Sequence, residues 1–82
     1  MSEQREKAIE ILEMFKTPET NINGFGYSQL QRDFARKMIL EIIKDNRESF
    51  QVAKEMYNRQ AEGLIAGIIV NWTIVLEELN NV

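Results

Sequence analysis

The stretch Leu64-Ile-Ala-Gly-Ile-Ile-Val-Asn-Trp-Thr-Ile-Val-Leu76 decides the fold of this chain. It holds no charged residue, and only Asn71 and Thr73 in it are polar. Apolar surface is unfavourable in water, so a helix that is apolar all round must be covered all round. The stretch continues the helical period of its neighbours, and Glu62 and Glu77 flank it. The sequence therefore predicts a buried helix here.

Two other interpretations of this stretch stay open. A β-strand agrees with its many β-branched residues, but the chain offers no second convincing strand to pair with it. A membrane span needs about 20 consecutive apolar residues, and the stretch between the flanking Glu62 and Glu77 is shorter than that. A buried helix would be either the centre of a monomeric bundle or the interface of a homodimer, and we favour the homodimer.

Small residues and one amide line an edge of the predicted helix. Gly63, Gly67 and Asn71 follow each other at four-residue spacing, which places them along one side of an α-helix. Glycines let two helix backbones approach closely, and a buried asparagine can fix the register of paired helices. Close packing within one chain would use the same pattern. The predicted oligomer interface consists of Gly63, Leu64, Gly67, Ile68, Asn71 and Trp72.

A second amphipathic helix precedes this stretch. Apolar residues recur at three- and four-residue spacing from Leu30 to Ile43, and Ser28 is a candidate N-cap. The pattern predicts a helix over about 28–44. Short connections favour antiparallel neighbours, so we expect this helix and the last one to form a hairpin.

The position of the hairpin turn is ambiguous in the sequence. Asp45 precedes Glu48 by three residues, which resembles a capping box and favours a turn at 45–46. The last helix would then span about 46–79, and Gly63 offers a further break near 60–63. The predicted core of the hairpin consists of Leu30, Phe34, Met38, Ile42, Phe50, Ala53, Tyr57, Leu64, Ile68, Trp72 and Leu76.

An N-terminal amphipathic helix is predicted over about 2–16, with Ser2 as its cap. It would pack on the hairpin through Ile11, Leu12 and Phe15. Thr17-Pro18 should end it, since the residue before a proline is pushed out of the helical region. Residues 17–26 contain two glycines, two asparagines and a proline, which predicts a flexible Gly/aromatic loop.

Four residues near this loop are candidates for binding a partner protein: Phe25, Tyr27, Arg32 and Arg36. The aromatic pair could instead fold back to plug the end of the bundle. The two arginines could contact phosphates or an acidic partner, or lie on a solvated face with local ion pairs. The loop lacks the strand and the glycine spacing of a nucleotide-binding loop.

Composition excludes several classes of function. The 82 residues are 44% hydrophobic and carry a net charge of −3, which indicates one small folded domain over residues 1–82 and disfavours a free-standing nucleic-acid binder. The chain has no Cys and no His, so it lacks disulfides, Cys/His zinc sites and histidine-dependent triads. Glu6, Glu10 and Glu13 share one side of a helix, where we expect a solvated acidic face. We expect no cofactor, no metal site and no enzymatic activity.

The fold predicted from the sequence is all-α: an N-terminal helix, the loop, and a helical hairpin, with three or four helices in total and oligomerisation through the last. The function predicted is that of a non-enzymatic small regulatory or adaptor protein, which acts in the cytoplasm by protein–protein interaction as a homo-oligomer. An accessory protein that neutralises a membrane or pore-forming partner (immunity or antiholin type) is an alternative, and a helical DNA-binding regulator is a third. The short, acidic, Lys/Asn/Ile-rich composition is similar to that of many small phage- or plasmid-encoded accessory proteins.

Overall fold

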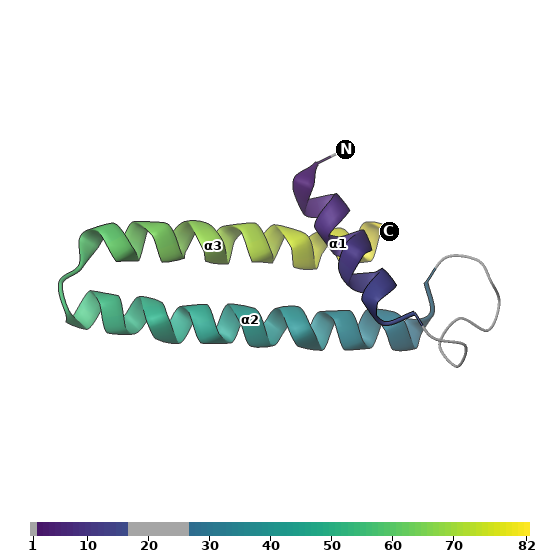
Figure 1. Cartoon of the computed structure of the whole chain (residues 1–82), viewed down its shortest axis with the longest axis horizontal. Coiled ribbons are helices and arrows are strands. Elements are labelled where there is room, and N and C mark those ends of the chain that lie inside the picture. Colours follow the sequence, from purple (N-terminus) through teal and green to yellow (C-terminus); the bar gives the residue numbers. More distant parts are fainter. Residues whose placement is uncertain (1, 17–26) are drawn as a thin grey trace.

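A computed structural model describes residues 2–16 and 27–82 of the chain (Figure 1). The described residues form an all-α fold, as predicted. Its elements are α1 (Glu3–Met14), α2 (Gln29–Glu55), α3 (Arg59–Glu78) and a short 3₁₀ turn, η1 (Leu79–Asn81). α2 and α3 run antiparallel and side by side as a hairpin, and α1 lies across the end of the hairpin that is remote from its turn (Figure 1).

The starts of the first two helices follow the sequence closely. The Ser2 side chain accepts a hydrogen bond from the backbone N–H of Arg5 at 3.1 Å and caps α1, as predicted. Ser28 caps α2 and forms a complete capping box with Gln31. Each cap satisfies an N–H group that has no partner inside its helix. α1 ends at Met14, and residues 17–26 lie outside the described part of the chain.

The hairpin turn lies at residues 56–58, so the predicted turn at 45–46 and the break near 60–63 are both wrong. α2 passes through Asp45 without interruption, because nothing there breaks a helix, and the Asn46 amide donates back to the carbonyl of Ile42 at 2.8 Å. Gly63 lies inside α3, which is continuous to Glu78.

Three residues without a glycine make the turn. The N–H of Asn58 donates to the carbonyl of Ala53 at 2.9 Å and that of Tyr57 to Lys54 at 3.1 Å, which is the Schellman pattern that ends a helix. The Asn58 side chain then accepts from the N–H of Ala61 at 3.2 Å and caps α3. Tyr57 has a φ of 55°, in the left-handed region that glycine usually occupies in this motif.

The core is centred where α1 crosses the hairpin. Its buried members come from all the elements: Ala8, Ile11, Leu12, Ala35, Ile39, Ile43, Val75 and Leu79. The predicted packing of α1 through Ile11 and Leu12 is confirmed, and Phe15 is packed against the same cluster. Apolar burial is the main stabilising term in a small domain, so this crossing provides most of the stability of the fold.

Several predicted core residues are exposed instead: Leu30, Phe34, Tyr57, Leu64 and Ile68. Met38, Ile42, Phe50, Trp72 and Leu76 are half-buried, and Ala53 is buried as predicted. Besides Ala53, the buried side chains of α2 are Gln31, Ala35, Ile39 and Ile43, each one residue after a member of the predicted stripe. The apolar band of α2 is wide enough to include both stripes, and the packing of α1 and α3 against α2 determines which of them is covered. Phe34 stacks on Phe15 with ring centroids 5.6 Å apart.

Candidate interaction surface on the hairpin

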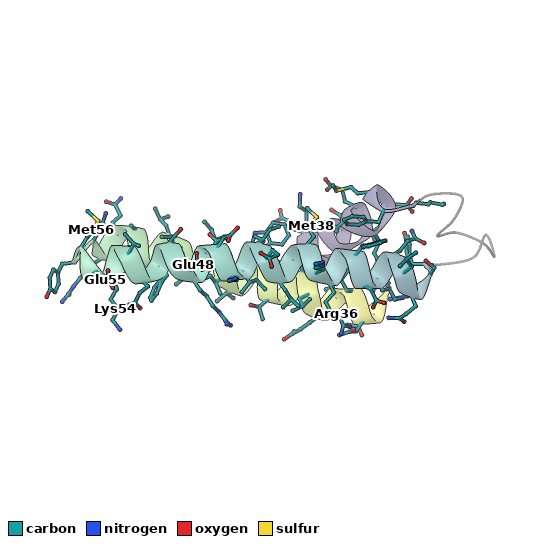
Figure 2. The ribbon with its side chains drawn as sticks, turned by 90° about the horizontal axis from the view of Figure 1, so that it is seen from below. Arg36, Met38, Glu48, Lys54, Glu55 and Met56 are labelled. Carbon is teal, nitrogen blue, oxygen red and sulfur yellow. The ribbon has the colours of Figure 1, made fainter. Side chains whose placement is uncertain are left out.

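The hairpin has a covered and an uncovered half. We call residues 29–43 and 68–79, next to α1, the covered half, and residues 44–67, around the turn, the uncovered half. Figure 2 shows Met38 beside α1 and Met56 at the far end, at the turn. All residues of the uncovered half are described, and Ala53 is its single buried residue. This half therefore has apolar surface that no third helix covers.

α3 presents an apolar stripe to solvent. Gly63, Gly67, Val70 and Ile74 recur at spacings of four, three and four, which places them on one face of the helix. We call these four residues the α3 stripe. All four are exposed, with relative exposures of 58% for Val70 and 36% for Ile74. No charged residue lies between Glu62 and Glu77, so the stripe has no charge within it.

The glycines of the stripe face open space. A Cβ atom built on Gly63 or on Gly67 would meet nothing within 4 Å. Close packing among the described residues of one chain, which the sequence left open, therefore does not explain them. Glycine costs about 1 kcal/mol relative to alanine inside a helix, and no contact within the described chain offsets that cost.

The other predicted interface residues of α3 are divided between solvent and the core. Leu64 is 66% exposed and Ile68 is 43% exposed. Trp72 is packed against the core, and the Lys7 ammonium lies 5.9 Å from the centroid of its ring. The Asn71 Oδ1 atom accepts a hydrogen bond from the Gln4 Nε2 amide of α1 at 2.9 Å, so its partner is found within the chain.

The structure describes only one of the two aromatic residues that were candidates for binding a partner, Phe25 and Tyr27. Phe25 lies outside the described residues. The Tyr27 hydroxyl donates to the Glu13 Oε1 carboxylate at 3.0 Å, and its ring is packed against the core. Burial raises the pKa of Tyr27 above its ordinary value of 10.0, and the hydrogen bond and negative charge of Glu13 raise it further. Tyr27 thus links the start of α2 to α1.

Arg32 and Arg36 donate hydrogen bonds to residues 79–82, which directly follow α3. Arg32 donates from Nη1 to the carbonyl of Leu79 at 2.6 Å and from Nη2 to the carbonyl of Val82. Arg36 donates from Nη2 to the Asn80 Oδ1 atom at 3.1 Å. Carbonyls at the end of a helix have no partner inside it, and cations are favourable there. The two arginines therefore attach residues 79–82 to α2.

Gln31 is a buried structural residue that was not predicted from the sequence. Its side chain has no exposed surface, and its Nε2 amide donates to the carbonyl of Leu12 at 3.1 Å. Its Oε1 atom accepts from the backbone N–H of Ser28 at 3.1 Å. Buried amides need such partners, and Gln31 has them on both sides of the α1–α2 junction. The Ser-x-x-Gln spacing is the signal that predicts this residue.

Two surface hollows lie on the described part of the chain. The described residues contain no group of three or more Asp, Glu, His or Cys side chains that could hold a metal ion. A hollow of about 450 Å³ lies by the turn at Lys54 and Tyr57, and another of about 320 Å³ lies by Leu40 and Leu76. The first hollow is lined by Gln51, Lys54, Glu55, Tyr57, Arg59 and Glu62, and the second by Arg36, Leu40, Leu76, Glu77 and Asn80. None of the described helices is both long enough and apolar enough to cross a membrane.

Comparison of the chain with protein-family models, with curated proteins and with solved structures gives no match. Within the described part of the chain, α3 carries exposed apolar side chains and has no charged residue between Glu62 and Glu77.

Proposed function

We propose that this protein is a non-enzymatic regulatory or adaptor protein that acts by protein–protein interaction as a homo-oligomer assembled through α3. One observation carries the proposal: Val70 and Ile74 are exposed on the uncharged α3 stripe, and Leu64 is exposed to one side of it. Contiguous apolar surface on a small soluble protein typically marks an interaction site.

Two features of the fold support this role. A hairpin of two helices leaves one side of each helix without a neighbour, and α1 covers only one end of the hairpin (Figure 1). The chain is also small, so it buries only about 60–65% of its unfolded surface, and a second subunit adds apolar burial that the single chain lacks.

Light scattering after gel filtration tests the proposal, from about 5 to about 200 µM protein. The wild type should have the mass of an oligomer, and Val70→Glu should lower that mass, because the new carboxylate would lose water in the interface. Val52→Glu is the matched control, since Val52 is 53% exposed on α2 and Val70 is 58% exposed on α3. A monomeric wild type at all concentrations would contradict homo-oligomer assembly.

The adaptor role needs a separate measurement. A tagged wild-type protein and Val52→Glu should recover the same stoichiometric partner from cells. If no stoichiometric partner is recovered, the oligomer has a role other than that of an adaptor.

A further inference from the structure

The α3 stripe is small at one end and large at the other. Gly63 and Gly67 come first, and the bulky Val70 and Ile74 follow. The spacings of four, three and four residues are those of the core positions of a coiled coil. When a second α3 is laid against the stripe in the opposite direction, Gly63 faces Ile74 and Gly67 faces Val70. Every bulky side chain then meets a gap. A parallel copy would instead place glycine on glycine and valine on valine.

The charges at the ends of α3 favour the same orientation. The first turn of α3 contains Arg59, Gln60 and Glu62, of which Arg59 and Gln60 flank the stripe, and the last turn ends with Glu77 and Glu78. In an antiparallel pair, Arg59 and Gln60 of one copy lie beside Glu77 of the second copy, so a cation and an amide meet a carboxylate. A parallel pair would place two Glu77 side chains together. Like charges at a helix contact are unfavourable, so the parallel arrangement is disfavoured.

We propose that two copies of the chain pair antiparallel through the α3 stripe, with Gly63 opposite Ile74 and Gly67 opposite Val70. The proposal rests on the proposed homo-oligomeric function and names the partner and the geometry of the same surface. The uncharged stripe offers no charge that would select a charged partner. A reversed copy supplies the complementary order of sizes from the same sequence.

The proposed pairing also places the uncovered half of one copy beside the covered half of the second copy. The first half of α3, which belongs to the uncovered half of the hairpin, lies beside the last half of the second copy's α3. That last half is the part on which α1 packs (Figure 1). Leu64, 66% exposed in the single chain, is thereby brought close to the α1–α3 junction of the second copy.

Disulfide trapping tests the orientation. The chain has no cysteine, so introduced thiols react only with each other. Gly63→Cys and Ile74→Cys proteins, one of them carrying a mass tag, are mixed and mildly oxidised. The mixed disulfide should exceed either homodimer several-fold. In the proposed pair, the two Gly63 positions lie eleven residues apart along the helix axis, about 16 Å, whereas a disulfide needs Cα atoms within about 7 Å.

The control for random collision is Val52→Cys mixed with Ile74→Cys, which should give only the background yield. A preference of Gly63→Cys for its own homodimer would show parallel pairing and overturn the proposal. A mixed yield equal to the background would overturn it as well.

The fit of the glycines is tested by Gly67→Leu. The new side chain enters open space in the single chain and favours the helix, so the variant should remain folded by circular dichroism. In the pair it would occupy the gap that receives Val70, and the dimer Kd should rise about tenfold or more. Gln51→Leu adds the same side chain at an exposed position of α2 and should leave the Kd unchanged. An unchanged Kd for Gly67→Leu would contradict the register.

The two proposals fail in distinguishable ways. A wild type that is monomeric in light scattering removes both. A wild-type dimer that Val70→Glu dissociates, but in which Gly63→Cys and Ile74→Cys do not cross-link, keeps assembly through α3 and removes the antiparallel register.

Discussion

The two halves of the hairpin are made of the same two helices and differ in what lies on them. In the covered half, Ile39 and Val75 have no exposed surface, because α1 adds a third apolar face to those of α2 and α3. In the uncovered half, Val52 and Leu64 remain more than half exposed. Stability is thus concentrated at the end where α1 crosses, and the surface that can bind other molecules extends from there toward the turn.

The largest expected effect tests this division directly. Ile39→Ala should lower the free energy of unfolding by about 2–5 kcal/mol, because it leaves a cavity under α1. Val52→Ala, on the exposed side of the uncovered half, should change it by less than about 0.5 kcal/mol. Urea denaturation measures both. Similar losses for the two variants would show that the halves are equally packed.

Gln31 provides the next test, because it holds α1 on the covered half. Gln31→Ala leaves the carbonyl of Leu12 without its buried donor and should lower the free energy of unfolding by about 1–3 kcal/mol. Gln51→Ala, an exposed glutamine in the uncovered half, is the control and should have almost no effect. Hydrogen exchange should show faster opening of α1 in the first variant. Equal stability of the two variants would argue against the Gln31 bonds as an anchor.

A substitution in the turn at 56–58 should stabilise the uncovered half. Tyr57 is 90% exposed and has a positive φ, so Tyr57→Gly relieves backbone strain and loses little packing. The gain in stability should be about 0.5–1 kcal/mol. Met56→Gly, at a residue with a φ of −87°, should instead destabilise by about 0.5–1 kcal/mol. Thermal denaturation distinguishes the two signs, and a loss of stability in Tyr57→Gly would mean that the tyrosine ring is needed at the turn.

The smallest effect concerns pH and the covered half. The pKa of Tyr27 is raised in the folded chain, chiefly by burial and then by Glu13. Its contribution to stability is therefore present below the unfolded value of about 10 and is lost as the pH rises through the folded pKa. Tyr27→Phe should remove this part of the alkaline loss of stability. Tyrosinate absorbance of Tyr57→Phe isolates Tyr27, and a midpoint at or below 10 would contradict the assignment.

Local signals in the sequence predict the helix starts well. Ser2 and Ser28 are side-chain caps, and a cap depends only on the next three residues. The helical character of 64–76 also follows from its period, and the structure confirms it. The hairpin turn is harder to predict, because Asn58 both ends α2 and caps α3 without a glycine or a proline nearby.

The choice of buried stripe depends on tertiary packing. Leu30 and Phe34 are as apolar as Ile39 and Ile43, and the packing of α1 and α3 against α2 decides which pair is buried. The role of Arg32 also depends on tertiary packing. Its position near the loop predicts a contact with a partner protein, but its guanidinium donates to the carbonyl of Leu79, 47 residues away in the chain. The sequence does place Gly63 and Gly67 on one helix edge, and their role in assembly stays a prediction.

The position of the core also has a consequence for the order of folding. Contacts between α2 and α3 beside the turn at 56–58 close the shortest loops in the chain. However, Ala53 is the one buried residue in the uncovered half. Pairing of the two helices that starts at the turn therefore gains little apolar burial. The buried contacts join segments far apart in the chain; the bond between Gln4 and Asn71 spans 67 residues. Non-local contacts slow folding because the entropy of loop closure is lost before burial compensates it. We therefore expect the hairpin and α1 to form together in one late cooperative step, more slowly than in a helical bundle whose turns are buried.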